Sequence, residues 1–336
     1  FGYSAEISGN GSTIAIGAPG DVQRVGRVYI YEYNGIEWNE TSQSDWIDDY
    51  GKNYDDFWGG EVALNKDGDI LAVSAIHFRL NEDQKPGSVK TFRKSSNGKW
   101  NEMGSRLGLY NSQFGKSLSL SDDGYTIAVG APEPSSETNN GQVVVWKYKN
   151  DIWEDLGEKL NGLNSNDQFG WSVSLNGSGD MLAVGSPSYG DDNNGLVNVY
   201  SLQNNSWSDF GQELIGYGKN SAFGKSVDLN NDGNTLVIGA ENISGIENTD
   251  GYTRVYRSIP TIFPVSIPDE YDFIGSDQLS INTSNGLLSN DYSPDSLDLT
   301  AVLVSDVSSG TLNLNLDGSF TYTSDGSTND DSFTYK

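Results

Sequence analysis

The chain has 336 residues, of which 47 are acidic and 20 are basic, so its formal net charge is −27. This acidity repels phosphate backbones and excludes nucleic acid as a partner, and no apolar run approaches the ~20 residues that a membrane-spanning helix needs. The absence of cysteine removes disulfides, thiolate nucleophiles and zinc-ribbon sites together. The first residue is Phe rather than Met, so we expect a processed or partial chain.

The composition favours an all-β fold. Hydrophobic residues make up only 35% of the chain, but 11% is aromatic and 40 residues are Gly. Many aromatics and glycines in an otherwise polar chain are typical of short strands joined by tight turns, rather than of a helical bundle. The length predicts two or three domains.

Five related segments follow one another from the first residue. Each begins with an aromatic residue and a glycine, and the successive spacings are 57, 56, 55 and 54 residues. The five starting pairs are Phe1-Gly2, Trp58-Gly59, Phe114-Gly115, Phe169-Gly170 and Phe223-Gly224. An internal repeat of this length indicates one supersecondary unit that is copied along the chain.

Each copy predicts four short strands. In the fourth copy, residues 169–175 alternate apolar and small residues with a period of two, and residues 181–187 are apolar on both faces, as in a strand between two sheets. A third strand follows a glycine, as in 195–200, and a tryptophan anchors a weaker fourth strand in four copies. These tryptophans are Trp38, Trp100, Trp153 and Trp207. Four strands in ~55 residues predict a β-propeller blade.

A glycine occupies the same register between the first two strands of every copy. It is preceded by Asn, Asp or Ser, a combination that predicts a two-residue hairpin turn with positive φ angles. The five dipeptides are Asn10-Gly11, Asp67-Gly68, Asp123-Gly124, Ser178-Gly179 and Asp232-Gly233.

The repeats resemble a known family. Phe-Gly opens the unit and Gly-Ala-Pro closes its second strand at 17–19 and 130–132, with Gly-Ser-Pro at 185–187, which is similar to the FG-GAP repeat. That repeat builds the propeller of integrin α subunits and of many secreted microbial proteins. The resemblance covers residues 1–257 and implies a propeller there; the second copy departs from it, with Ser74-Ala75-Ile76 in place of Gly-Ala-Pro.

The number of blades stays open at this point. The family usually closes its ring with seven blades, whereas five copies are present and the fifth lacks a tryptophan-anchored fourth strand after Arg257. Either two copies and a closing strand lie upstream of Phe1, or five blades close tightly with one three-stranded blade.

A linker and a second module follow the repeats. Three evenly spaced prolines predict an extended segment at 258–268, which is apolar enough to dock on the propeller or on another chain. Alternating segments return from Asp269, and residues 286–291, 299–304, 317–323 and 331–336 resemble bacterial Ig-like or cadherin-like modules. This resemblance implies a β-sandwich over 269–336 that lacks its last strand. Truncation explains that lack, or a partner supplies the missing edge by β-augmentation, with the linker as a natural donor.

Calcium is the cofactor that the sequence favours. Integrin-type repeats carry an acidic loop between the first two strands, and the fifth copy matches its start with Asp228, Asn230 and Asp232 before Leu236 breaks the pattern. Two other acidic loops are alternative calcium sites. They contain Asp191 with Asp192, and residues 247–250. In the tail, Asn290-Asp291 matches the cadherin-like motif, but Ser293 replaces its next acidic residue.

The sequence contains no arrangement of residues that indicates a catalytic site. His77 is the single histidine and no serine is set apart to pair with it, so we expect a structural histidine. Six Asn-x-Ser/Thr sequons occur in a chain rich in these residues. They lie at Asn10, Asn39, Asn176, Asn204, Asn242 and Asn282.

These patterns predict a secreted or cell-surface protein without enzymatic activity. We expect an adhesive or structural role, with other protein subunits or an extracellular protein or glycan as partners and without membrane insertion. One alternative is a self-assembling filament, a homopolymer whose subunits exchange strands between linker or tail and a neighbour. Another is a glycan-active enzyme built on the propeller.

Overall fold

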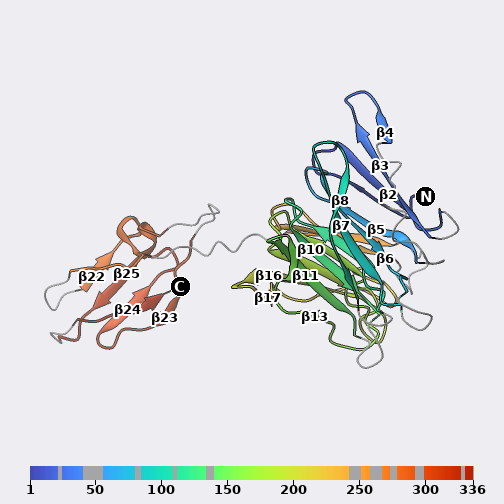
Figure 1. Ribbon diagram of the computed structural model, residues 1–336. Coiled ribbons are helices and arrows are strands. Elements are labelled where there is room, and N and C mark those ends of the chain that lie inside the picture. The colour runs from blue at the N-terminus through green and yellow to red at the C-terminus, as the bar shows by residue number, and fades with distance from the viewer. Residues whose placement is uncertain are drawn as a thin grey trace. The chain divides into compact units, whose positions relative to one another are not determined.

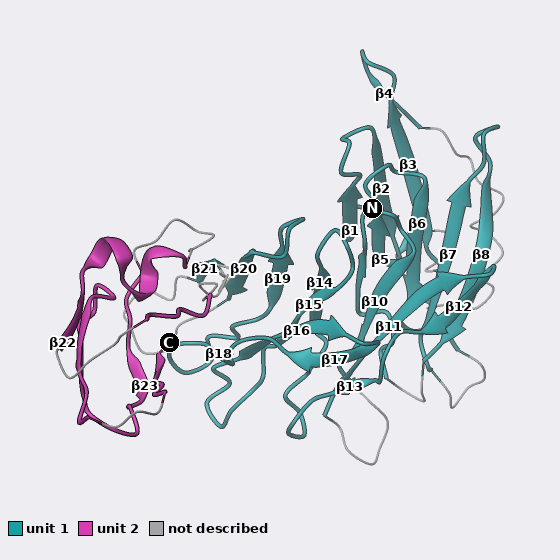
Figure 2. Cartoon of the chain, turned by 90° about the vertical axis from the view of Figure 1, so that its left-hand side faces the viewer, with its two compact units in different colours: residues 1–257 teal, residues 258–336 magenta. Residues whose placement is uncertain are grey.

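The computed structural model describes residues 1–21, 25–40, 56–79, 85–108, 112–133, 140–241, 251–257, 267–272, 278–291, 299–326 and 330–335. They divide into two compact units, residues 1–257 and residues 258–336 (Figure 2). Regular structure in both units is almost entirely antiparallel strand, which confirms the all-β prediction (Figure 1). Within the described ranges, no helix has the length and apolar character to span a bilayer.

The described part of unit 1 forms five sheets, one for each predicted copy, which we call repeats 1 to 5. Repeat 1 contains β1 (Ser4–Ile7), β2 (Thr13–Ala18), β3 (Arg27–Tyr33) and β4 (Trp38–Glu40). Repeat 2 contains β5 (Trp58–Leu64), β6 (Ile70–Ala75), β7 (Ser88–Lys94) and β8 (Trp100–Leu107). Repeat 3 contains β9 (Ser117–Leu120), β10 (Thr126–Ala131), β11 (Gln142–Lys149), β12 (Ile152–Asp155) and β13 (Leu160–Asn161).

The last two repeats differ in their number of described strands. Repeat 4 contains β14 (Ser172–Leu175), β15 (Met181–Ser186), β16 (Leu196–Gln203), β17 (Ser206–Asp209) and β18 (Leu214–Ile215). Repeat 5 contains β19 (Ser226–Leu229), β20 (Thr235–Ala240) and β21 (Tyr252–Arg257). The first strands of each sheet form a meander in chain order, which is compatible with propeller blades, and the short β13 and β18 pair with the third strands β11 and β16.

The hairpins between the first two strands differ from the two-residue turns expected. The connection from Ile7 to Thr13 spans five residues, and at its tip only Gly11 has a positive φ, of 69°. The equivalent glycine in each other repeat has a φ of 71°. A side-chain oxygen closes the loop, as where the Ser8 hydroxyl accepts the Thr13 backbone N–H at 3.0 Å. The dipeptide therefore predicts the glycine correctly but not the loop length, because the preceding cap residue extends the turn.

The apolar core of unit 1 lies between successive sheets. One cluster joins Ala15, Val28 and Ile30 of repeat 1 to Trp58 and Leu71 of repeat 2. Three further clusters join the following repeats in the same way. The middle strands β6 and β10 are buried at every residue, as expected for strands with a sheet on each side.

Unit 2 is smaller and has short strands. Its elements are β22 (Gln278–Ile281), η1 (Thr283–Asn285), η2 (Leu287–Ser289), β23 (Leu303–Ser305), β24 (Thr311–Leu314), β25 (Phe320–Thr323) and β26 (Thr334–Tyr335). One sheet has the order β22-β25-β24, and β23 pairs with β26. Among the described residues of this unit, Leu287, Ala301 and Phe320 form a buried core, surrounded by partly buried aromatic and aliphatic side chains.

Two side chains near the C-terminal end of unit 2, those of Asp331 and Tyr335, form hydrogen bonds with earlier residues of the unit. The Tyr335 hydroxyl lies 3.0 Å from an Asp269 carboxylate oxygen and 3.1 Å from an Asp291 carboxylate oxygen. The Asp331 carboxylate accepts the backbone N–H groups of Ser308 and Ser309 at 2.8 and 2.9 Å. Because most of its core is only partly buried, this unit depends on such polar contacts more than unit 1 does.

Candidate functional site

The structure gives the predicted calcium ligands of repeat 5 separate positions along one hairpin. Asp228 lies on β19, and its carboxylate accepts the Ser174 hydroxyl of repeat 4 at 3.4 Å. The Asn230 amide oxygen accepts the Thr235 backbone N–H at 2.9 Å, the same capping role that Ser8 has in repeat 1. Asp232 lies in the turn that follows. Calcium at this hairpin stays a prediction.

The other predicted acidic loops are only partly described. Asp192 forms an ion pair with Lys219 at 3.1 Å, and its carbonyl accepts the Asn220 N–H. Its neighbour Asp191 lies exposed in the same loop. Residues 247–250, Asn242, Ser293 and most of the linker lie outside the described residues. Among the described residues, no group of three or more His, Cys, Asp or Glu side chains is arranged to hold a metal.

The aromatic–glycine pair of each later repeat packs into a site on the repeat before it, which we call the seat. This repeated packing explains the sequence motif. The aromatic residue of each later repeat forms a parallel bridge with a glycine of the repeat before it, as Gly141 does with Phe169 and Gly195 does with Phe223. The next glycine carbonyl then accepts a serine hydroxyl from the first strand of the earlier repeat. These bonds run from Ser4 to Gly59 (3.1 Å), from Ser117 to Gly170 (2.9 Å) and from Ser172 to Gly224 (2.8 Å).

Glycine is required in this seat because backbone approaches backbone. A Cβ atom built on Gly185 would lie 2.1 Å from the Gly224 carbonyl oxygen, and one on Gly195 would lie 2.0 Å from the Phe223 carbonyl oxygen. No side chain tolerates such distances. The Gly of Gly-Ala-Pro and the Gly before the third strand are therefore both parts of one inter-repeat contact. Repeat 2 departs from it, with Ser74 at the first glycine position and Glu61 in place of the donor serine.

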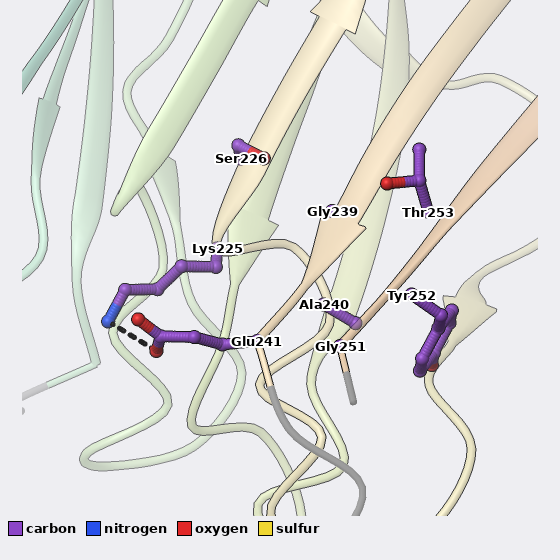
Figure 3. A pocket seen from close by; sticks show the side chains of 8 residues that line it. All are labelled: Lys225, Ser226, Gly239, Ala240, Glu241, Gly251, Tyr252 and Thr253. Atoms are coloured by element: carbon purple, nitrogen blue, oxygen red, sulfur yellow. Dashed lines mark ion pairs between the residues drawn. The ribbon is translucent and has the colours of Figure 1, made fainter. Parts of the chain in front are cut away.

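The same seat is present in repeat 5, where none of the described residues fills it. Ser226, Gly239 and Gly251 occupy the positions of the serine and the two glycines, and a cavity of about 320 Å³ lies over them (Figure 3). A Cβ atom built on Gly239 or Gly251 meets only atoms of repeat 5 itself. Lys225 and Glu241 form an ion pair of 3.2 Å at the edge of this cavity (Figure 3).

Charged and aromatic side chains also come together where the first strands of neighbouring repeats begin. The ammonium groups of Lys116 and Lys225 lie 4.6 and 4.5 Å from the centre of the Trp171 ring. Lys116, Trp171 and Lys225 each directly follow an aromatic–glycine pair, so the repeat brings them together. We call these three residues and Glu61 the first-strand cluster.

The acidic groups near this cluster titrate close to neutral pH. Burial raises the pKa of Glu61 to about 7, with Lys116 lowering it and Glu6 raising it further. Glu6 lies on β1 and is exposed, but partial desolvation and then the charge of Asp228 raise its pKa to about 7. Burial also lowers the pKa of the Lys116 ammonium, against the effect of Glu61. The cluster can therefore change its net charge near neutral pH.

Sequence reasoning did not find the first-strand cluster. The sequence position that could have revealed it is the residue after each aromatic–glycine pair. In repeats 3, 4 and 5 this residue is Lys116, Trp171 and Lys225. Only alignment of the copies position by position would have shown that these residues share one site. His77 lies elsewhere, with its ring 5.0 Å from that of Phe57 and its backbone N–H bonded to the Asp56 carbonyl.

The solved structures that resemble this chain are distant from it in sequence. A search of the curated proteins found no match. Among solved structures, a candidate 6-phosphogluconolactonase from Bacteroides uniformis is 12% identical with a TM-score of 0.48, over 80% of this chain and 75% of that chain. A candidate TolB from Agrobacterium tumefaciens is 9% identical with a TM-score of 0.43, over 76% of both chains. At these scores neither likeness carries an argument about function.

Two family models match defined parts of the sequence, the FG-GAP repeat at residues 161–200 and the bacterial Ig domain at residues 263–336. The first match falls on repeat 4 and the second on unit 2. The chain thus carries an FG-GAP repeat followed by a bacterial Ig domain, modules that are typical of extracellular and cell-surface proteins.

Proposed function

We propose that this chain is a secreted or surface-displayed adhesive or structural protein that acts through contacts with proteins or glycans, without catalysis. The observation that supports this proposal is the pairing of FG-GAP repeats with a bacterial Ig domain in one chain. Calcium bound by the acidic loops, with Asp228, Asn230, Asp232, Asp191 and Asp192 as ligands, remains part of the proposal.

The first-strand cluster is the surface that we assign to partner contact. Its two half-buried ammonium groups stand out in a chain with a net charge of −27, so they favour carboxylate or sulfate groups of an acidic peptide or glycan. Both lysines lie against Trp171, so the ring orients the ammonium groups rather than offering a free face for sugar stacking.

Binding of the full chain to arrays of acidic glycans and extracellular proteins tests this assignment. We expect Trp171→Ala to weaken the contact about tenfold, because the two ammonium groups lose their common support. Trp38→Ala is the matched control, since Trp38 is 40% exposed at the outer strand of repeat 1. Equal binding by both variants would remove the cluster as the contact surface, and no bound partner at all would contradict an adhesive role.

One observation favours a second candidate, a glycan-active enzyme. Glu61 and Glu6 lie on first strands of adjacent repeats, interact electrostatically and both have a pKa of about 7, a value suited to a general acid. Glycoside hydrolysis uses such a carboxylic acid with a second carboxylate. Hydrolysis of chromogenic glycosides by the native chain and by the Glu61→Gln variant tests this second candidate. Turnover that disappears in the variant would replace the non-enzymatic proposal, and absence of turnover with the native chain would remove the second candidate.

A further inference from the structure

The first strands of repeats 3, 4 and 5 are joined by two kinds of side-chain hydrogen bond. One is the bond of the seat, in which a serine hydroxyl donates to the glycine carbonyl of the next repeat. In the other, a second serine accepts a backbone N–H. The Leu175 N–H donates to the Ser119 hydroxyl at 2.9 Å, and the Leu229 N–H donates to the Ser174 hydroxyl at 2.9 Å.

The first strands of repeats 2 and 3 also contact each other, and we call the contact between β5 and β9 the inner seam. Among the described residues it has neither kind of bond, because Glu61 stands at the position of the first serine and Ala63 at that of the second. The Ser74 side chain faces the seam, with its Cβ 2.7 Å from a Cβ atom built on Gly115. Its hydroxyl is buried without a hydrogen-bond partner among the described residues. The inner seam thus buries polar groups without joining them.

Strand β5 is also irregular within its own sheet. Trp58 pairs with Ala75 and Val62 pairs with Val73, so residues 59–61 oppose the single residue Ser74. Such a bulge interrupts the hydrogen bonds between neighbouring strands. The part of β5 that carries Glu61 is therefore held less firmly by its sheet than the regular first strands β9 and β14 are.

Other contacts keep repeats 2 and 3 together away from this part of β5. Between their outer strands, the Trp153 indole N–H donates to the Thr91 hydroxyl at 2.8 Å. Beyond the other end of β5, Lys66 forms an ion pair with Asp122 at 3.1 Å. Separation at the inner seam can therefore stay local, at the end of β5 that carries the aromatic–glycine pair.

Glu61 is the titratable group of the inner seam. Burial is the largest effect on its pKa and raises it to about 7, while the charge of Lys116 lowers the pKa and that of Glu6 raises it. The charged groups that act on Glu61, directly or through one another, are Lys116, Glu6, Lys225, Glu133 and Asp228. Since burial outweighs the attraction of Lys116, the closed seam favours the neutral acid, and the carboxylate is more stable where water reaches it.

We propose that the inner seam is a pH-sensitive joint, closed while the Glu61 carboxyl keeps its proton and open at the aromatic–glycine end of β5 once that proton is lost. Opening lets water reach the carboxylate and the Ser74 hydroxyl, while the outer strands keep the two repeats joined. The closed seam holds a proton that a hydrated carboxyl releases near its ordinary pKa of 4.5. Its advantage is therefore complete below pH 4.5 and is lost as the pH rises through 7. The inference goes beyond the adhesive role and needs no bound partner.

Thiol labelling of the full chain tests the joint, because the chain has no cysteine of its own. Ala72→Cys places a thiol in the apolar cluster between repeats 2 and 3, and Ala128→Cys places one at the equivalent position between repeats 3 and 4. Both alanines are fully buried, so the ratio of the two labelling rates with a maleimide largely cancels the pH dependence of the thiol reaction. Between about pH 5.5 and pH 8 we expect this ratio to rise about tenfold or more, as the inner seam opens.

The same ratio in a Glu61→Gln background shows whether this carboxyl controls the joint. The amide keeps the size of the side chain but does not titrate, so the ratio should stay constant over this pH range. Glu154→Gln, at an exposed residue of β12, is the matched control and should retain the rise. A ratio that is independent of pH with Glu61 present, or one that still rises with Glu61→Gln, would overturn the proposal.

Amide hydrogen exchange of the native chain repeats the test without any substitution. After correction for intrinsic rates, exchange in β9 should accelerate relative to exchange in the equivalent strand β14 as the pH rises over the same range. Equal acceleration in both strands would overturn the proposal. None of these measurements depends on Trp171 or on a bound partner, so they leave the adhesive role to its own test.

Discussion

The two units of this chain keep their apolar residues in different places. In unit 1 the buried clusters lie between sheets, so that the core of one repeat is completed by the next. In unit 2 the core lies inside a single small module, and three of its described residues are fully buried there. Stability in unit 1 is therefore a sum of interfaces between neighbours, whereas unit 2 depends on one small core and a few polar contacts.

The largest effect should follow from removing a side chain shared by two repeats. Trp58→Ala deletes a fully buried indole between repeats 1 and 2, and we expect a loss of about 3–5 kcal/mol in the free energy of unfolding. Urea unfolding monitored by circular dichroism measures it. Trp38→Ala should cost much less, because that ring is 40% exposed. Similar losses in both variants would show that unit 1 does not depend on its interfaces.

A glycine of the aromatic–glycine seat tests the contact itself. In Gly185→Ala the new Cβ would lie 2.1 Å from the Gly224 carbonyl oxygen, so repeats 4 and 5 must separate. We expect a loss of about 2–4 kcal/mol, because backbone rather than a flexible side chain has to move. Gly20→Ala is the control, since a Cβ atom there meets nothing within 4 Å. If thermal unfolding were the same for both variants, the close approach would not be essential to the stack.

A pH series sharpens the comparison at the first-strand cluster. The pKa of Glu61 is about 7 in the folded chain against an ordinary 4.5, so the folded state keeps a proton that the unfolded chain releases between these values. Its stabilising effect is complete below pH 4.5 and is lost as the pH rises through 7. Glu61→Gln should therefore gain stability relative to the native chain, by on the order of 1–3 kcal/mol at pH 8. Glu154→Gln, at an exposed residue of β12, is the control. A difference between Glu61→Gln and native chain that is independent of pH would contradict the assignment.

The smallest effect concerns the polar contacts of unit 2. The pKa of Asp331 lies below its ordinary value of 3.8. Partial desolvation raises this pKa, but hydrogen bonds from Ser308 and Ser309 lower it by more. The resulting stability is present above this value and is lost as the pH falls through the lower folded-state pKa. Asp331→Asn should cost roughly 1 kcal/mol at neutral pH, with Asp330→Asn as the control. The rate of amide hydrogen exchange at residues 303–323 measures this loss of stability. Equal exchange rates in both variants would show that Asp331 does not stabilise the module.

Much of the architecture was predictable, because its signals are local and repeated. Alternation within 169–175 predicts β14, and the apolar 181–187 predicts β15, which the structure places at Ser172–Leu175 and Met181–Ser186. The short strands β13 and β18 were not predicted, since two residues carry no period. The hairpin length was also missed, because the capping bond of Ser8 to Thr13 depends on backbone positions beyond the Asn10-Gly11 pair.

The candidate sites were less predictable than the fold. Residues proposed for calcium were selected from a linear motif, and one of them, Asn230, serves as the hairpin cap in the structure. The first-strand cluster and the seat depend on which repeats are neighbours, information that no single motif contains. Glu61 illustrates the point, because burial and the charge of Glu6 in repeat 1 raise its pKa, whereas the charge of Lys116 in repeat 3 lowers it.

The sequence by itself determined the all-β class, the five-fold repeat and the Ig-like module, because alternation, turn glycines and repeat spacing act over short distances along the chain. Only the tertiary structure decided why the motif needs its glycines. In the stack the Gly185 backbone meets the Gly224 carbonyl of the next repeat, whereas no described residue of another repeat meets Gly239. The physical reason is that steric exclusion and desolvation depend on distances between segments far apart in the chain, up to 52 residues for the bond between Ser172 and Gly224, which local pattern cannot specify.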